Sequence, residues 1–302
     1  MTRARFGTST GWKISRWWRR SVGRQYLKVN SIGELLENLG KPGAMILCGG
    51  TDLVVKMRSG LLSPELLLDI SDLPELREIK KNGSKIEIGT AVTQSELLAS
   101  EIVRERLPLL ITVLSQLGCV QIRNRGTLGG NLVNASPAAD SAIPLLLYDA
   151  EVILTGSQGE RRLAVKDFFR GPGKNALSNG EFLRAVSIPL PNPKLYPFFH
   201  KIGRRKALTI AIASLGALLH VEGDLIQEVR LAAGSVAPTP IRLRRVEERA
   251  NGKRVTASLI EEARKLAQQS VSPIADIRAS ADYRRTVIAD LVAHLFEGVL
   301  HV

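Results

Sequence analysis

Cysteine is scarce in this sequence, which holds only Cys48 and Cys119 among its 302 residues. Two cysteines are too few for a disulfide framework, and neither has a neighbour at metal-ligand spacing. An iron–sulfur cluster takes about four protein ligands, so the chain by itself is not predicted to hold one. Both cysteines are interpreted as small packing residues.

Long apolar runs are also missing. The longest apolar stretch, Leu208 to Leu219, is interrupted by Thr209, Ser214 and Gly216, whereas a membrane-spanning helix needs about 20 consecutive apolar residues. The basic leader, residues 1–25, is followed by no apolar segment of the kind found in a secretory signal. The sequence therefore predicts a cytoplasmic protein without a membrane span.

Aromatic residues make up only 5% of the chain, although its formal net charge is +13. A strongly basic protein can bind nucleic acid or meet acidic protein surfaces. The basic residues outside the leader lie in scattered pairs, with few aromatics beside them for base stacking. This distribution argues against nucleic acid as the main ligand and favours an acidic protein surface as the partner.

The residue patterns of hydrolytic and metal catalysis are absent from the sequence. No Ser-His-Asp or paired-carboxylate arrangement is visible, so no residue is assigned a catalytic role. The four histidines show no metal spacing; they are His200, His220, His294 and His301.

Hydrophobic patterns indicate two lobes in residues 26–193, of α+β class. The first lobe, residues 26–76, is expected to contain a helix over 32–39, with Ser31 and Glu34 as its capping box, and a buried strand over 44–47.

The second lobe, residues 77–193, is expected to contain a helix that begins at a capping box of Thr93 and Glu96. Residues 121–140 are interpreted as a loop. The proline-rich Pro189 to Pro193 is the expected domain boundary.

The C-terminal domain, residues 194–302, is predicted to be a small α+β unit with a three-stranded antiparallel sheet. Two helices are expected to pack on this sheet. One is predicted to start at Ser258, with Glu261 as its capping-box partner, and the other to run from Ser280 to Leu300.

Two glycine pairs follow strand-like or polar segments and carry the functional signal. Gly49-Gly50 follows a strand directly, and Gly129-Gly130 lies between Thr127 and Asn131. Glycine lets backbone N–H groups approach a pyrophosphate closely. Neither loop fits the dinucleotide fingerprint of a Rossmann fold. Together, the two loops predict a clamp for a dinucleotide.

With these two loops, the sequence resembles the FAD-binding medium subunits of the carbon monoxide dehydrogenase and xanthine dehydrogenase family. The resemblance runs from about Tyr26 to the C-terminus. Its carriers are Gly49-Gly50-Thr51-Asp52-Leu53, residues 122–140, Ala237-Pro238-Thr239-Pro240, and residues 276–285.

The resemblance implies a two-lobed FAD-binding domain of the vanillyl-alcohol-oxidase (PCMH) type and an electron-transferring flavoprotein oxidoreductase subunit. It also implies that iron–sulfur clusters and molybdopterin reside on partner subunits, a small and a large one, in a dimer of heterotrimers. An external acceptor would take the electrons.

The resemblance also assigns residues to the cofactor. The FAD phosphates are assigned to Cys48, Gly49, Gly50, Thr51 and Asp52 in the first loop and to Thr127, Leu128, Gly129, Gly130 and Asn131 in the second. Asp140 is assigned to ribityl or ribose hydroxyls, Lys201 and Phe199 to the flavin ring, and Leu183 to apolar packing. Cys48 stands where the family commonly has alanine.

Four alternatives stay open from the sequence alone, two for single residues and two for the function. Asp140 is also a good N-cap for a helix over 141–147. For Lys201, the alternative is an ordinary lysine at the protein surface. At the level of function, the alternatives are a self-contained FAD-dependent reductase of the same fold and a basic, non-catalytic binding protein whose glycine loops are only turns.

Overall fold

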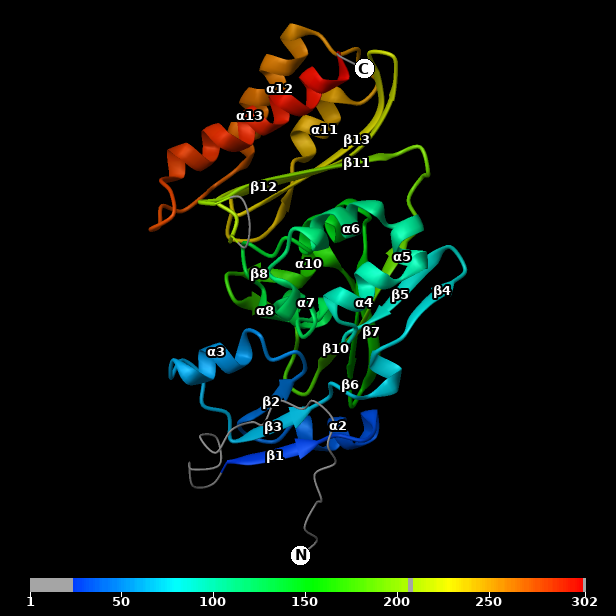
Figure 1. The fold of residues 1–302 in the computed structure, drawn as a ribbon, viewed down its shortest axis with the longest axis vertical. Helices are drawn as coiled ribbons and strands as arrows, with labels where there is room; N and C mark the ends of the chain where they lie inside the picture. The colour runs from blue at the N-terminus through cyan, green and yellow to red at the C-terminus, as the bar shows by residue number, and fades with distance from the viewer. Residues whose placement is uncertain (1–23, 206–208, 301–302) are drawn as a thin grey trace, which may run out of the picture.

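The computed structural model describes residues 24–205 and 209–300. Most of the leader expected over residues 1–25 therefore lies outside the described residues. The described chain forms three tiers, stacked along the long axis of the molecule (Figure 1). The α+β class is confirmed.

The first tier is a three-stranded parallel sheet in the order β1-β3-β2, formed by Gln25–Lys28, Leu66–Asp69 and Ala44–Leu47. Helix α2 (Ile32–Leu39) begins at Ser31, whose side chain accepts from the N–H of Glu34. Both the strand and the helix end where the sequence predicts. Leu35 and Leu68, fully buried, anchor the core of this tier.

The middle tier is a five-stranded antiparallel sheet in the order β4-β5-β10-β6-β7. Its strands are Ile79–Asn82, Lys85–Gly89, Phe182–Pro189, Glu151–Gly156 and Gly159–Ala164. The predicted capping box of Thr93 and Glu96 is confirmed at the start of α4 (Gln94–Ala99).

Further helices pack with this sheet around the largest apolar core. They are α5 (Glu101–Arg106), α6 (Pro108–Ser115), α7 (Val120–Arg123), α8 (Leu128–Asn134), α9 (Ala142–Leu147) and α10 (Val165–Phe168). The expectation of a loop over residues 121–140 was wrong in part, because α7 overlaps its start and α8 lies within it. Three short elements remain. The 3₁₀ helix η1 (Pro74–Leu76) precedes β4, and β8 (Phe169–Gly171) and β9 (Lys174–Asn175) form a two-stranded sheet.

The third tier is an antiparallel sheet in the order β11-β12-β13-β14, formed by Tyr196–Ile202, Ala213–Glu222, Leu225–Gly234 and Ile241–Arg242. The three predicted strands are present, and the two-residue β14 adds a fourth. Because side chains alternate along a strand, the sheet presents two apolar faces. One packs towards α6 and α9, and the other carries α11 (Arg244–Ala250), α12 (Ala257–Ser270) and α13 (Ala281–Val299).

The two predicted long helices of this tier are present, with one correction. Helix α13 spans Ala281–Val299, within one residue of the expected bounds, and Ser280 is its N-cap, with its side chain accepting from the N–H of Tyr283. The cap of α12 is Thr256 and not Ser258, because the Thr256 side chain accepts from the N–H of Leu259. Among the described residues, no helix is both long and apolar enough to cross a membrane.

Candidate functional site

The first glycine loop joins the end of β2 to α3 (Leu53–Arg58). Gly50 has a φ of +74°, a conformation that glycine adopts without the usual steric cost. Within the described part of the chain, the N–H groups of Gly50, Thr51, Asp52 and Leu53 donate to no protein acceptor. Such a run of free N–H groups at the start of a helix suits an anionic group.

The second glycine pair opens α8, where its two members have different surroundings. Thr127 caps the helix, its Oγ1 accepting from the N–H of Gly130 at 3.0 Å. Gly129 is buried, and a Cβ at this position would lie 1.8 Å from the Thr90 Oγ1. Gly130 is exposed, and Leu128 lies in the core. Gly129 therefore serves packing, while Gly130 leaves the backbone accessible.

The two loops touch each other directly. A Cβ on Gly49 would lie 2.1 Å from the carbonyl oxygen of Arg125, so that only glycine allows this approach. Asn134 of α8 donates to the Asp52 carboxylate at 3.1 Å and accepts from Lys56 of α3 at 2.5 Å. The two glycine loops thus meet between the first and middle tiers, as a clamp would require.

The segment that follows α8 leads to a buried ion pair. The Asn131 Oδ1 accepts from Ser141 at 2.6 Å, which ties α8 to the start of α9. Lys201 of β11 donates to the Asp140 Oδ2 at 2.9 Å and to the Gln116 carbonyl oxygen at 2.8 Å. The side chains of Asp140 and Lys201 are only 8% and 6% exposed.

This pair decides two of the open alternatives. The residue that caps α9 is Ser141, so Asp140 is not its N-cap, and Lys201 is not a surface lysine. Burial raises the pKa of the Asp140 carboxyl, and the ammonium group of Lys201 opposes that rise. The Asp140 Oδ1 is buried without a hydrogen-bond partner in the described structure, so it is available to accept from a ligand hydroxyl.

The two apolar residues assigned to the flavin lie on different sheets. Leu183 of β10 is buried in the main core, opposite Leu154 in the strand register. Phe199 of β11 is partly buried against the same core. Because Phe199 and Lys201 are two residues apart on one strand, both side chains point towards the middle tier.

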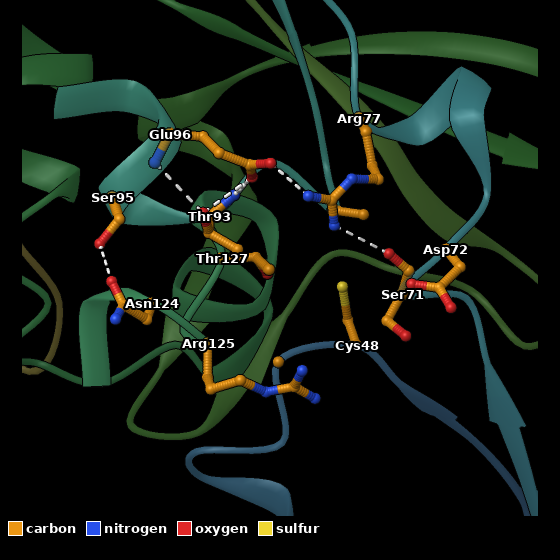
Figure 2. Close-up of a pocket in the computed structure, with 12 residues that line it drawn as sticks. Cys48, Ser71, Asp72, Arg77, Thr93, Ser95, Glu96, Asn124, Arg125 and Thr127 are labelled. Atoms are coloured by element: carbon orange, nitrogen blue, oxygen red, sulfur yellow. Dashed lines mark hydrogen bonds and ion pairs between the residues drawn. The ribbon is translucent and has the colours of Figure 1, made fainter. Parts of the chain in front are cut away.

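A polar cavity of ≈ 360 Å³ lies between the first two tiers (Figure 2). It shares only Cys48, Gly49 and Thr127 with the residues assigned to FAD. Sequence reasoning assigned none of the other lining residues to a site: Thr93 and Glu96 were predicted only as a capping box, and Asn124 and Arg125 only as part of the segment that carries the resemblance. The remaining lining residues have no motif of their own: Ser71, Asp72, Arg77, Ala91 and Ser95.

Several cavity side chains already bind one another. Arg77 forms an ion pair with Glu96 and donates to the Ser71 carbonyl oxygen at 3.0 Å. Ser95 donates to Asn124 at 2.6 Å. The Arg77 contacts join the first tier to the middle tier, and the Ser95 contact joins two helical segments of the middle tier, so the cavity wall is a structural link next to the glycine loops.

Cys48 lines this cavity at the root of the first loop. Burial raises the pKa of its thiol to about 11, although a hydrogen bond with Thr127 acts in the opposite direction. A thiol with so high a pKa stays protonated and unreactive near neutral pH. Cys48 is therefore placed as a packing residue and not as a reactive thiol.

Among the described residues there is no cluster of three or more His, Cys, Asp or Glu that could hold a metal.

The residues present fit a dinucleotide such as FAD. The free N–H groups of the first loop provide donors for phosphate, the exposed Gly130 leaves room for close approach of the backbone, and the unpaired Asp140 oxygen provides an acceptor for a hydroxyl. The structure brings Asn131, Asp140 and Lys201 together, whereas Leu128, Gly129 and Leu183 support the site from the core.

Comparison with known proteins agrees with this geometry. Residues 20–191 match the FAD-binding domain of molybdopterin dehydrogenases, and residues 198–299 match the C-terminal domain of carbon monoxide dehydrogenase flavoproteins.

Three relatives illustrate the likeness along nearly the whole chain. The glyceraldehyde dehydrogenase medium chain of Sulfolobus acidocaldarius is 31% identical, over 91% of this chain and 97% of the relative. The xanthine dehydrogenase FAD-binding subunit of Escherichia coli O157:H7 is 34% identical, over 89% and 91%. A solved structure of carbon monoxide dehydrogenase from Hydrogenophaga pseudoflava superimposes with a TM-score of 0.86 at 30% identity, covering 90% of this chain and 95% of that chain.

Proposed function

Because the chain belongs to the family of FAD-binding medium subunits of molybdenum hydroxylases, we propose that it carries electrons from a partner's iron–sulfur clusters through FAD to an external acceptor. The partners would be a small iron–sulfur subunit and a large molybdopterin subunit, in a cytoplasmic dimer of heterotrimers. Relatives named as a medium chain or an FAD-binding subunit support a multi-subunit assembly.

The observation that carries the proposal is the run of four free N–H groups from Gly50 to Leu53. These groups would hold the FAD phosphates without a charged side chain. The free oxygen of Asp140 would accept a hydrogen bond from a ribityl or ribose hydroxyl. Lys201 fixes the direction of that carboxylate, and Lys201 and Phe199 would place β11 beside the cofactor.

The redox chemistry belongs to the bound flavin, which accepts electrons singly and releases them as a pair. The chain contributes binding, orientation and a fixed electrostatic environment. Its net charge of +13 would speed encounter with an acidic partner and make the association weaken with salt.

The test uses the purified single chain, reconstituted with FAD and free of iron and molybdenum. We expect it to exchange electrons with an artificial dye but not to oxidise an aldehyde, a purine or carbon monoxide. In the complete complex, addition of the organic substrate should bleach the flavin absorbance. Turnover of such a substrate by the single chain at about 1 per second or more would contradict the subunit role and favour a self-contained enzyme.

A further inference from the structure

The segment between α12 and α13 is an exposed turn held in one conformation. The Asp276 carboxylate accepts from the N–H of Arg278 at 2.8 Å, from the Arg278 guanidinium at 2.8 Å and from the Arg284 guanidinium at 2.7 Å. The Asp276 N–H in turn donates to the Ala279 carbonyl oxygen. A loop without helix or strand is therefore fixed by its own hydrogen bonds.

Arg284 attaches this turn to the C-terminal sheet. Its side chain is buried and donates to the Ile212 carbonyl oxygen at 2.6 Å and to the Ser235 carbonyl oxygen at 2.9 Å. The N–H of Ser235 donates to the Pro137 carbonyl oxygen, three residues before Asp140. The turn is thus connected, through two residues, to the segment that carries the proposed flavin contact.

This rigid turn presents large apolar side chains to solvent. Ile277 is 85% exposed and Ile274 is 69% exposed, and Ile210 on the neighbouring strand connection is also exposed. Arg204 donates to the Ile277 carbonyl oxygen at 2.6 Å, which places the end of β11 against the turn. Figure 1 shows the turn, in orange before α13, at the end of the sheet where β11 ends. We call Ile210, Ile274 and Ile277 the isoleucine patch.

The surroundings of the patch are basic. Residues 203–212 and 271–286 include five described arginines against two aspartates. Both aspartates, Asp276 and Asp282, are paired with arginines. Arg284 is buried, and Arg278 and Arg285 pair with the two aspartates. The excess positive charge at the surface therefore lies at Arg204 and Arg205. Exposed apolar side chains beside this basic edge suit a partner with an apolar pocket and an acidic rim. A second copy of this chain would bring a second positive rim and be repelled.

We propose that the isoleucine patch is the docking surface for the iron–sulfur subunit, an inference that rests on the proposed function. Lys201 is the second-last residue of β11, and Arg204, three residues further on, donates to the Ile277 carbonyl oxygen, so the patch lies at the end of the strand that carries Lys201. An electron donor must approach the flavin closely, and docking at this end of β11 would bring the donor towards the residues assigned to the flavin ring. The fixed conformation of the turn reduces the entropy lost when it becomes buried.

The test begins with the iron–sulfur subunit that co-purifies with the tagged wild-type chain, identified by its iron content and then purified alone. Its binding to the FAD-loaded chain is measured by titration calorimetry at low and high salt. We expect Ile277→Asp and, separately, Ile274→Asp to weaken binding by at least about tenfold, as for loss of a buried apolar anchor. Their FAD content and thermal stability should match the wild type, because both side chains are exposed.

Tyr196→Asp is the matched control. Tyr196 is 75% exposed and begins β11, at the strand end opposite Ile202. The same change of apolar to acidic side chain should leave binding unchanged there. Binding that weakens with salt, is lost in the isoleucine variants and is kept in the control supports the proposal.

Other results overturn the proposal in distinguishable ways. If the wild-type chain binds the iron–sulfur subunit and Ile277→Asp binds equally well, the function stands and the surface is wrong. If the wild-type chain binds no iron–sulfur subunit, the proposed function itself fails. Loss of self-association, or loss of the molybdopterin subunit alone, in Ile277→Asp would assign the patch to another occupant.

Discussion

Lys201 and Asp140 form a buried ion pair of 2.9 Å that joins the C-terminal sheet to the FAD-binding domain. The lysine also donates to the Gln116 carbonyl oxygen, so one cation holds two segments of the middle tier. The carboxylate uses only Oδ2 in this pair, and its Oδ1 is buried without a partner in the described structure. The pair therefore has a structural side and a side open to a ligand.

Because the ion pair of Lys201 and Asp140 stabilises the fold, we expect a large loss of stability in Lys201→Met. This change leaves the Asp140 carboxylate buried without its cation, which typically costs about 3–5 kcal/mol. The double variant Lys201→Met, Asp140→Asn should recover part of that loss, because the unpaired charge is gone. Urea unfolding of the FAD-free chains measures both. Equal stabilities of the single and double variants would show that the two residues are not coupled.

Because the Asp140 Oδ1 is open to a ligand, we expect weaker FAD binding in Asp140→Ala. Loss of one hydrogen bond to a cofactor hydroxyl should cost roughly 1–3 kcal/mol. Flavin fluorescence titration of the reconstituted chain gives the affinity. Asp282→Ala, at an exposed residue of α13, serves as the control and should bind FAD as the wild type does. Unchanged affinity in Asp140→Ala would place the cofactor hydroxyls elsewhere.

The two glycines of α8 should respond differently to substitution. Gly130→Val should abolish FAD binding and leave the fold largely intact, since Gly130 is exposed and only the Thr127 Oγ1, at 2.9 Å, is close to the new Cβ. Gly129→Ala should instead reduce the thermal stability, because its Cβ would overlap Thr90. Circular dichroism and FAD titration separate the two effects. Normal FAD affinity in Gly130→Val would show that the pyrophosphate lies elsewhere.

FAD is expected to bind without a covalent bond. Cys48 lies in the first loop, but burial raises the pKa of its thiol to about 11, which keeps the nucleophilic thiolate scarce. Acid precipitation of the holoprotein should leave all flavin in the supernatant, and Cys48→Ala should bind FAD normally. Flavin retained in the wild-type pellet but released from Cys48→Ala would identify Cys48 as an attachment point.

Local elements were predictable where a short-range pattern determines them. The helix over Ile32–Leu39 and the capping box of Thr93 follow from side chains within one turn of the helix end. The cap of α12 was misplaced because Thr256 and Ser258 are both acceptable caps, and the packing of Leu259 into the core selects Thr256.

The arrangement of the site depends on contacts between distant residues, which a single sequence does not reveal. Gly129 is typical of a loop, yet it lies in helix α8, and this position requires glycine because Thr90, 39 positions earlier, leaves no room for a side chain. Aspartate is a common helix N-cap, so the local sequence suggests that role for Asp140. Its actual partner is Lys201, which lies 61 residues further along the chain. The family resemblance named both Asp140 and Lys201, whereas local patterns left each with an ordinary alternative.

The turn before α13 predicts a specific response to acid. Burial raises the pKa of Asp276, but hydrogen bonds from Arg278, Ala279 and Arg284 outweigh it and hold the pKa at about 2, below the ordinary 3.8. The folded state therefore binds this proton less readily than the unfolded state. The stability that Asp276 contributes is fully present above about pH 4 and is lost as the pH falls towards 2.

Asp276→Asn should consequently be less stable than the wild type at pH 6, by roughly 1–3 kcal/mol for the weakened hydrogen bonds to Arg284 and Arg278. The difference should shrink as the pH falls from 4 towards 2, because the wild-type carboxyl then becomes neutral as well. Urea unfolding across that range measures the difference. Asp282→Asn, whose carboxylate is exposed and pairs with Arg285, should stay close to the wild type throughout, since surface pairs contribute little. A stability difference for Asp276→Asn that is constant from pH 6 to pH 2 would show that the Asp276 charge does not hold the turn.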